Sequence, residues 1–350
     1  MPEISQPAPA KTVLYGKTLQ ELSEIVSALS LPAFTAKQIA GWLYKQQVDS
    51  IGAMTSLSAK TRALLEKTCE TGVCAPETVQ VSRDGTKKYL FPVSGGRHVE
   101  AACIPDRNRT TLCLSSQAGC RMGCAFCMTG RQTAGGNLTA ADILNQFRSL
   151  PERDTLTNIV YMGMGEPFDN PVEVMKSLEI LTSPYGYGWA PKRITVSTAG
   201  IIPPLQNFMA HSRCHLAVSL HHPDSTERKK LMPVENKYPV RQIVELLKTY
   251  NLNRQRRISF EYIMLAGVND SPEHAAAVAR LLSGLRCRIN LIPCHTFPGN
   301  PFAPPNKSVI RQFAETLQQK GMTVTIRQSR GTDIDAACGM LSAKKKKNSV

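Results

Sequence analysis

Apolar residues recur along this chain with two different periods, and the change of period divides it into segments. From residue 13 to residue 75 they recur at helical spacing. Two of these helical stretches open on Thr18 and Thr35, each followed three residues later by Glu or Gln. This pattern is typical of capping boxes at helix N-termini. We therefore predict a small N-terminal helical accessory domain over 13–75, preceded by a Pro-rich, disordered tail at 1–12.

Residues 76–106 change to the two-residue alternation of β-strands. Three alternating stretches, at 77–83, 87–93 and 98–104, are separated by Asp-Gly and Gly-Gly turn sequences. Such pairs favour tight hairpin turns because glycine adopts positive φ angles at no steric cost. The pattern predicts a β-meander extension over 76–106.

From residue 107 on, strand-like and helix-like stretches alternate. The predicted strands are 111–115, 158–162, 193–197, 215–220, 258–264, 288–292 and a short one at 323–327. The predicted helices are 139–150, 171–181, 202–210, 240–250, 273–282 and 307–320. Six strand–helix units in succession predict an α/β fold with a parallel barrel, complete or partial, over 107–341. A basic tail at 342–350 follows.

Composition narrows the class of protein. No apolar run approaches the 18 residues that a membrane span needs, and the N-terminus lacks the pattern of an export signal. The eleven cysteines are odd in number and three crowd one loop, which favours reduced thiols and a metal over a disulfide framework. We expect a cytoplasmic protein without membrane association.

The chain is strongly basic, with a net charge of +15. The excess remains large without the four lysines at 344–347, which alone would fit a solubilising end. Because Lys and Arg neutralise phosphates, the charge indicates a polyanionic partner such as RNA.

The stretch Gly119–Met128 holds three cysteines, Cys120, Cys124 and Cys127, at the spacing C-x3-C-x2-C. Its glycines let the backbone curl so that three thiolates point at one volume. A zinc site of this type would continue with a fourth Cys or His at short spacing, and neither follows. The pattern favours a [4Fe–4S] cluster with one iron left open, and three reduced structural thiols are the alternative.

Other polar clusters follow the predicted strands directly. Gly163-Met-Gly-Glu-Pro follows the second strand, 197–200 the third, 219–221 the fourth and 293–295 the sixth. In parallel barrels the chemistry lies at the carboxyl ends of the strands. We expect these clusters to surround one site together with the cysteine loop.

The cysteine spacing is the signature of the radical S-adenosylmethionine (SAM) superfamily, and Cys113–Cys120 resembles the corresponding segment of the RlmN/Cfr RNA adenine methylases. The match extends from about Gly95 to Leu341. It implies an open, partial (β/α)6 TIM-like barrel. It also implies that the open iron chelates the amine and carboxylate of SAM, which the reduced cluster cleaves to a 5′-deoxyadenosyl radical.

The resemblance also implies a set of SAM contacts around the cluster. These are Gly165, Glu166, Ser197, Ser219, Leu220, His221 and His295. The family usually has Asn where His295 stands.

Three further residues match the catalytic groups of the family. Cys338 lies in Asp-Ile-Asp-Ala-Ala-Cys-Gly, which resembles the loop whose cysteine becomes S-methylated, and Cys113 matches the resolving cysteine. Glu100 matches the proton acceptor. In the implied mechanism the methyl carbon of Cys338 becomes a radical and adds to the base. Glu100 then removes the proton of the base carbon, and Cys113 attacks the Cys338 sulfur to release the product.

The resemblance implies methylation of adenine carbon 2 in the peptidyl-transferase centre of 23S rRNA and beside the anticodon of tRNA. It also implies a monomer and a low-potential electron donor such as flavodoxin. Two alternatives remain at this point: a Cfr-type methylase acting on carbon 8, and a non-catalytic iron–sulfur RNA-binding redox protein.

Overall fold

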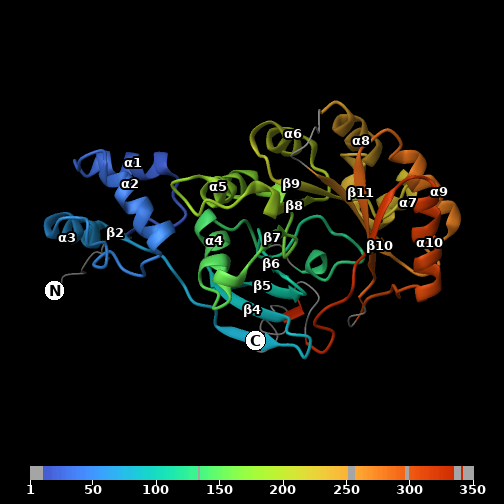
Figure 1. Ribbon diagram of the computed structural model, residues 1–350, viewed down its shortest axis with the longest axis horizontal. Helices are drawn as coiled ribbons and strands as arrows, with labels where there is room; N and C mark the ends of the chain where they lie inside the picture. The colour runs from blue at the N-terminus through green and yellow to red at the C-terminus, as the bar shows by residue number, and fades with distance from the viewer. Residues whose placement is uncertain (1–10, 133–134, 251–256, 296–298, 335–339, 342–350) are drawn as a thin grey trace, which may run out of the picture.

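The computed structural model describes residues 11–132, 135–250, 257–295, 299–334 and 340–341. Its core is a sheet in the order β12-β11-β10-β9-β8-β7-β6-β5-β4-β3 (Figure 1). The strands are β3 (Thr78–Val81), β4 (Lys87–Val93), β5 (Arg97–Asp106), β6 (Arg109–Cys113), β7 (Asn158–Tyr161), β8 (Ile194–Thr198), β9 (His215–Ser219), β10 (Ile258–Met264), β11 (Cys287–Pro293) and β12 (Thr323–Ile326).

Strands β6 to β12 run parallel to their neighbours. The helices between them are α4 (Ala140–Arg148), α5 (Pro171–Thr182), α6 (Ile202–His211), α7 (Ser225–Leu231), α8 (Val240–Lys248), α9 (Pro272–Leu281) and α10 (Lys307–Gln319). Figure 1 shows them around the outside of the curved sheet. The predicted α/β class, built from six strand–helix units, is confirmed. The sequence did not predict α7.

The two faces of strand β10 show how the sequence builds this arrangement. Phe260 and Tyr262 are fully buried on the outer face, where the Tyr262 ring packs against Phe313 of α10 at a centroid distance of 5.2 Å. Ser259, on the opposite face, lines a cavity inside the barrel. Aliphatic side chains fill an ordinary closed barrel. Here polar residues on the inner face leave room for a ligand.

The meander β3–β5 extends the sheet in antiparallel fashion beyond β6. Among the described strands β12 and β3 are the two edges, so the sheet stays open. The segment after β12 returns to the β3–β4 turn. There Asp333 accepts hydrogen bonds from the Ser82 hydroxyl and from the N–H of Arg83, the latter at 3.0 Å. Asp84 accepts one from the N–H of Gly331 at 2.8 Å.

The N-terminal residues form α1 (Leu19–Ala28), α2 (Thr35–Ala40), which continues as a π-helix over Gly41–Gln46, and α3 (Ala59–Thr68). The short parallel strands β1 (Thr12–Val13) and β2 (Cys69–Glu70) close this module. Thr18 and Glu21 form the predicted capping box of α1. The capping box predicted at Thr35 is wrong. Thr35 is the first helical residue and is buried, and the cap residue Phe34 makes no side-chain cap hydrogen bond.

The module is fastened to the barrel by polar contacts and by close backbone packing. The Tyr15 and Tyr187 hydroxyls are 2.6 Å apart, and Lys176 of α5 lies 2.7 Å from the Glu21 carboxylate. A Cβ on Gly16, which has a φ of +79°, would lie 2.4 Å from the backbone nitrogen of Ala141. Only glycine fits this approach.

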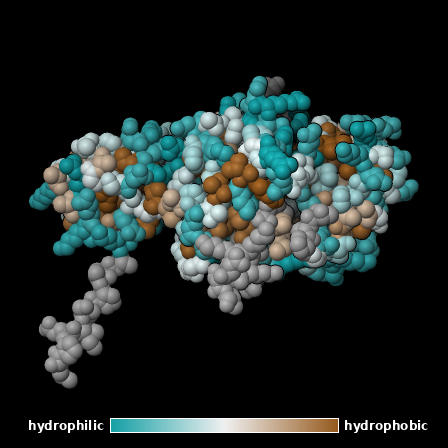
Figure 2. All heavy atoms as spheres, turned by 90° about the horizontal axis from the view of Figure 1, so that it is seen from below, coloured by the Kyte–Doolittle hydropathy of each residue, from teal (hydrophilic) through white to brown (hydrophobic). Residues whose placement is uncertain are grey.

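Most of the molecular surface visible in Figure 2 is polar, with apolar residues gathered near the middle of that face. None of the helices in the described part of the chain combines the length and apolar character that crossing a bilayer requires.

Candidate active site

The cysteine loop follows β6 at the carboxyl edge of the barrel. Gly123 has a φ of +64°, which curls the chain between the first two cysteines. The N–H of Ala125 donates to the carbonyl of Leu231 at 2.9 Å, and the N–H of Cys127 donates to the carbonyl of Cys124 at 3.1 Å. Helix α7, which ends at Leu231, therefore supports the loop.

The thiols of this loop influence one another electrostatically. The pKa of Cys120 is raised to about 12, chiefly by burial and in part by the charges of Glu166 and Cys127. Burial also raises the pKa of Cys124 well above its usual range, with added contributions from Cys127 and Cys120. Three neighbouring, part-buried thiols ionise together only when a cation compensates their charge, which fits a cluster of iron ions.

No three His, Cys, Asp or Glu side chains in the described residues converge as ligands of a single metal ion. A cubane does not require this, because each of its cysteines binds a different iron. The three cysteines at this spacing therefore fit such a cluster. Met122, Cys124 and Phe126 pack against one small group of buried apolar side chains that contains Leu231 and Met232.

The glycines of Gly163–Gly165 let the loop after β7 approach the segment before the cysteines. A Cβ on Gly163 would lie 2.6 Å from the Leu114 carbonyl oxygen, and a Cβ on Gly165 2.5 Å from the Gln117 Cβ. The Met164 carbonyl accepts hydrogen bonds from the N–H groups of Ser116 and Gln117 at 2.8 and 3.2 Å. The close approach that these glycines permit is thus to the segment that leads into the cysteine loop.

Glu166 is buried and bonded to the end of β8. Its carboxylate accepts hydrogen bonds from the Thr198 hydroxyl at 2.6 Å and from the N–H groups of Ala199 and Phe168 at 2.7 and 3.0 Å. Burial raises the pKa of the Glu166 carboxyl to about 7, although these hydrogen bonds lower it. The side chain expected to face SAM therefore joins the loops that follow β7 and β8.

The other expected SAM contacts lie at the same edge. Ser197 is in β8 and Ser219 ends β9. His221 has a φ of +57° and accepts a hydrogen bond at Nδ1 from the N–H of Ile263 at 3.0 Å. Burial lowers the pKa of His221 to about 3, so its imidazole is neutral, and its ring meets that of Phe126 edge-on at 4.7 Å.

Leu220 and His295 complete the expected set. Leu220 is fully buried, and its N–H donates to the Glu261 carbonyl at 2.9 Å. His295 follows β11, and burial lowers its pKa. The structure thus brings these residues to the carboxyl edge where the cysteine loop lies.

Sequence reasoning missed Arg228, the largest fully buried side chain among the described residues. It forms an ion pair with Glu235 and donates to the carbonyls of Ser219 and Ala199 at 2.7 and 3.1 Å. Its charge also acts on the Cys124 thiol, whose pKa it lowers. Arg228 lies on the unpredicted helix α7, whose start could have been recognised from the cap residue Asp224 followed three residues later by Glu227.

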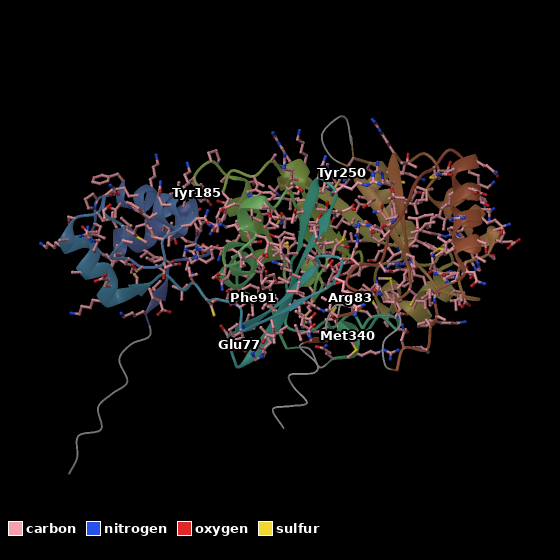
Figure 3. The ribbon with its side chains drawn as sticks, turned by 60° about the horizontal axis from the view of Figure 1, so that its bottom comes forward. Glu77, Arg83, Phe91, Tyr185, Tyr250 and Met340 are labelled. Atoms are coloured by element: carbon pink, nitrogen blue, oxygen red, sulfur yellow. The ribbon has the colours of Figure 1, made fainter. Side chains whose placement is uncertain are left out.

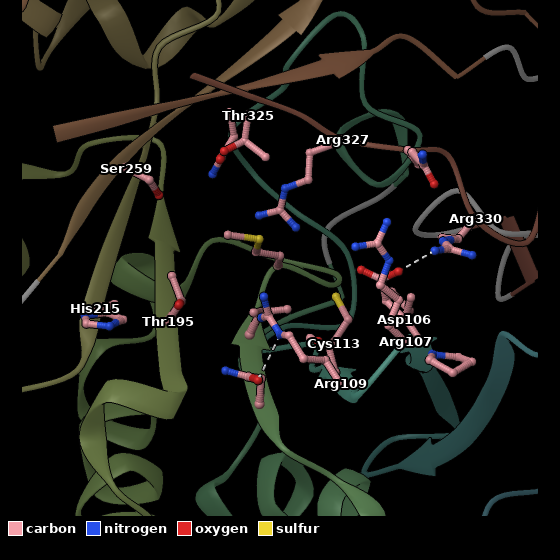
Figure 4. Close-up of a pocket in the computed structure, with 18 of the residues that line it drawn as sticks. Asp106, Arg107, Arg109, Cys113, Thr195, His215, Ser259, Thr325, Arg327 and Arg330 are labelled. Atoms are coloured by element: carbon pink, nitrogen blue, oxygen red, sulfur yellow. Dashed lines mark hydrogen bonds and ion pairs between the residues drawn. The ribbon is translucent and has the colours of Figure 1, made fainter. Parts of the chain in front are cut away.

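A cavity of about 920 Å³ occupies the inside of the barrel (Figure 4). Cys113, the last residue of β6, lines it near the carboxyl edge, whereas Arg109 and His215, the first residues of β6 and β9, line the amino edge. The arginines around it are Arg107, Arg109, Arg257, Arg288, Arg327 and Arg330. Figure 4 shows Arg109, Arg327 and Cys113 directed into the same space.

These arginines make the cavity strongly basic. Burial lowers the pKa of Arg257, and the charges of Arg288, Arg109 and Arg327 lower it further. The Arg288 Nε is buried without a hydrogen-bond partner among the described residues. Asp84 and Asp106 are the acidic residues in the lining. A cavity lined by six arginines and two aspartates attracts anionic groups.

The expected catalytic residues are partly described. Ala102 of β5 pairs with Cys113 of β6, and Glu100 lies two residues before Ala102 on the same strand. Because residues two apart share a face of a strand, Glu100 and Cys113 lie on one face. Cys338 is outside the described residues. Figure 3 shows Met340 and Arg83 on the side of the molecule that carries the meander.

A cysteine loop of this spacing over the carboxyl edge of an open parallel barrel defines a radical SAM protein. Residues 114–279 match the family model described as "Radical SAM superfamily", and residues 12–71 match the "Ribosomal RNA large subunit methyltransferase N-terminal domain". A radical SAM methyltransferase from Sphaerobacter thermophilus has a similar structure, with a TM-score of 0.87 and 39% identity, covering 94% of this chain and 98% of that one.

Known proteins narrow the class further. A "Probable dual-specificity RNA methyltransferase RlmN" of Parabacteroides distasonis is 52% identical over 335 residues, which are 96% of this chain and 98% of that protein. A "Dual-specificity RNA methyltransferase RlmN" of Geotalea uraniireducens is 42% identical over 327 residues, 93% of this chain and 95% of that protein. The chain belongs to the RlmN family of radical SAM RNA methyltransferases, which use a [4Fe–4S] cluster and SAM. These relatives do not favour the Cfr-type alternative.

Proposed function

We propose that the protein methylates carbon 2 of adenosine in 23S rRNA and in tRNA. The observation that carries this proposal is the barrel cavity, which Cys113 lines near the carboxyl edge and which arginines line at both edges. An RNA base fits the polar interior, and the arginines suit the phosphates on either side of it.

We infer roles for the residues around this cavity. Cys120, Cys124 and Cys127 would hold the cluster, and the edge formed by Gly165, Glu166, Ser197, Ser219, Leu220, His221 and His295 would face SAM. When bound, SAM and the reduced cluster supply the radical that activates a methyl group. Carbon 2 of adenine is neither nucleophilic nor usefully acidic, which is why simple displacement from SAM does not suffice.

Three residues of the chain would complete the transfer. Cys338 would carry the methyl group, and Glu100 would accept the proton of the base carbon. Cys113 would then attack the Cys338 sulfur and release the RNA as the disulfide forms. The sharing of one strand face by Glu100 and Cys113 supports this assignment.

The same proposal includes the finer points that the family resemblance implies. The protein would act as a cytoplasmic monomer and take electrons from a low-potential donor such as flavodoxin. We also propose that the chain is divided into an accessory domain at 13–75, a meander at 76–106 and a barrel at 107–341.

Mass spectrometry of 23S rRNA and tRNA tests the proposal, before and after anaerobic incubation with the reconstituted protein, SAM and a reductant. We expect a new methyl group on carbon 2 of adenine in both RNAs. Methylation on carbon 8, or release of 5′-deoxyadenosine without RNA methylation, would contradict the assignment.

A further inference from the structure

Lys88 and Glu100 form an ion pair inside the sheet. The Lys88 Nζ lies 2.6 Å from the Glu100 Oε2, and the two side chains are only 3% and 4% exposed. Lys88 of β4 pairs with Ala102 of β5, which in turn pairs with Cys113 of β6. Lys88, Glu100 and Cys113 therefore share one face of three neighbouring strands.

The burial of the charged Lys88 side chain requires a physical explanation. Lysine is almost never fully buried unless it is paired, because removing its charge from water is costly. The same holds for the carboxylate, which in an apolar setting without a counter-charge takes up a proton and becomes neutral. A neutral carboxylic acid cannot act as a proton acceptor.

We propose that Lys88 is a positioning residue that keeps Glu100 ionised and oriented as the proton acceptor for the RNA base. This inference rests on the function proposed above, in which Glu100 removes a proton from the base carbon. Glu100 is buried before any RNA binds, so its counter-charge has to come from the protein rather than from water or ions.

The proton transfer balances without any change in the bonds of Lys88. The carbon–hydrogen bond of the base breaks, its proton forms an O–H bond with a Glu100 carboxylate oxygen, and the electron pair stays on the base. The Lys88–Glu100 pair changes from neutral to a net charge of +1. A buried positive charge favours loss of that proton to water once the RNA leaves, which returns Glu100 to its ionised form.

A purely structural ion pair is the competing explanation, because many buried pairs do no more than satisfy each other. The two explanations predict different kinetics. Loss of a structural pair lowers every activity of the protein together. Loss of a positioning residue spares the first equivalent of 5′-deoxyadenosine, which forms before the proton transfer, and blocks the formation of methylated adenine.

The first experiment measures both products during anaerobic turnover with RNA. Lys87→Met is the matched control, because Lys87 is the neighbouring residue of β4 and pairs with Glu152 instead, at 2.5 Å. We expect the control to keep the wild-type ratio of methylated adenine to 5′-deoxyadenosine. Lys88→Met should lower this ratio at least tenfold, as Glu100→Gln should. Lys88→Arg, which keeps the charge, should restore most of it.

A second variant and a second measurement keep the test decisive. Lys88→Gln keeps a hydrogen-bond donor without the charge and should also uncouple the products, which covers a failure of Lys88→Met to fold. Infrared difference spectra of the protein without cofactors report the charge of Glu100 directly. Lys88→Met should show the carbonyl band of a protonated carboxyl group, and this band should vanish in Lys88→Met/Glu100→Gln.

Coupled turnover in both uncharged variants would overturn the inference, and so would a parallel fall of both products. These outcomes differ from failure of the proposed function. In that case the wild-type protein itself would produce no methylated adenine.

Discussion

The Glu166 carboxylate accepts a hydrogen bond from the backbone N–H of Ala199 at 2.7 Å and so joins the loops that follow β7 and β8. The first of these loops also packs against the segment that leads into the cysteines, through Gly163 and Gly165. The buried carboxylate thus joins two loops at the carboxyl edge, and the two glycines pack the first of them against a third segment.

Glu166→Gln should destabilise the protein by about 1–3 kcal/mol, because an amide nitrogen cannot accept from the N–H groups that face it. The pKa of Glu166, raised from 4.5 to about 7, adds a pH signature. A raised carboxyl pKa means that the folded state favours the protonated form. The stabilisation that protonated Glu166 gives the folded state is therefore complete below pH 4.5 and is lost as the pH rises through about 7.

Urea unfolding at pH 5 and pH 8 measures this effect. The wild-type protein should lose about 2 kcal/mol more than Glu166→Gln between the two pH values. Asp154→Asn, at a side chain that is 82% exposed, serves as the control and should behave as the wild type. Equal pH dependence in the wild type and Glu166→Gln would show that Glu166 ionises normally.

Cys113→Ala should trap RNA on the protein. This variant keeps the proposed methyl carrier Cys338 and the radical chemistry, but it lacks the thiol that opens the covalent link. RNA should co-purify with Cys113→Ala and be absent from Cys113→Ala/Cys338→Ala, as gels and absorbance spectra of the purified proteins would show. Loss of a buried thiol costs about 1 kcal/mol and lowers only the yield. Normal turnover of Cys113→Ala without trapped RNA would disprove the resolving role.

Arg257→Gln and Arg288→Gln should weaken RNA binding and reduce its dependence on salt. Each lost phosphate contact should flatten the slope of log affinity against log salt by about 0.7, the value for single strands. Fluorescence anisotropy at several salt concentrations measures the slope. Lys229→Gln, at an exposed position on α7, is the matched control. Unchanged slopes for both arginine variants would mean that RNA does not reach the part of the cavity that Arg257 and Arg288 line.

Asp333→Ala should slow methyl transfer without affecting the cluster. Asp333 binds the β3–β4 turn through Ser82 and Arg83, only five residues before Cys338. Freeing this segment should reduce kcat severalfold, because the carrier thiol is held less closely to its partners. Iron content and visible absorbance should match the wild type. A normal kcat would show that the anchor does not position the carrier.

Much of this architecture follows from local patterns in the sequence. The alternation of strand-like and helix-like stretches over 107–341 predicted six strand–helix units, because the spacing of apolar residues is a local property of the sequence. The cysteine loop was predictable because its ligand spacing is local. The buried Lys88–Glu100 and Arg228–Glu235 pairs were not. In the sequence, a buried charged residue in a strand or a short helix cannot be told from an exposed one. Its partner becomes known only in the folded chain.

The described strands form an open sheet rather than a closed ring, and this limits the size of what can be modified in an unusual way. A closed ring of strands admits only molecules that pass through its ends, and a nucleotide in the middle of a folded RNA has no end to thread. Among the described strands β12 pairs with β11 alone, and hydrogen bonds of Gly331 and Asp333 hold the following segment to the meander. The wall of this barrel therefore has a seam. A single base swung out of a long polymer can be received at such a seam while the polymer itself stays outside.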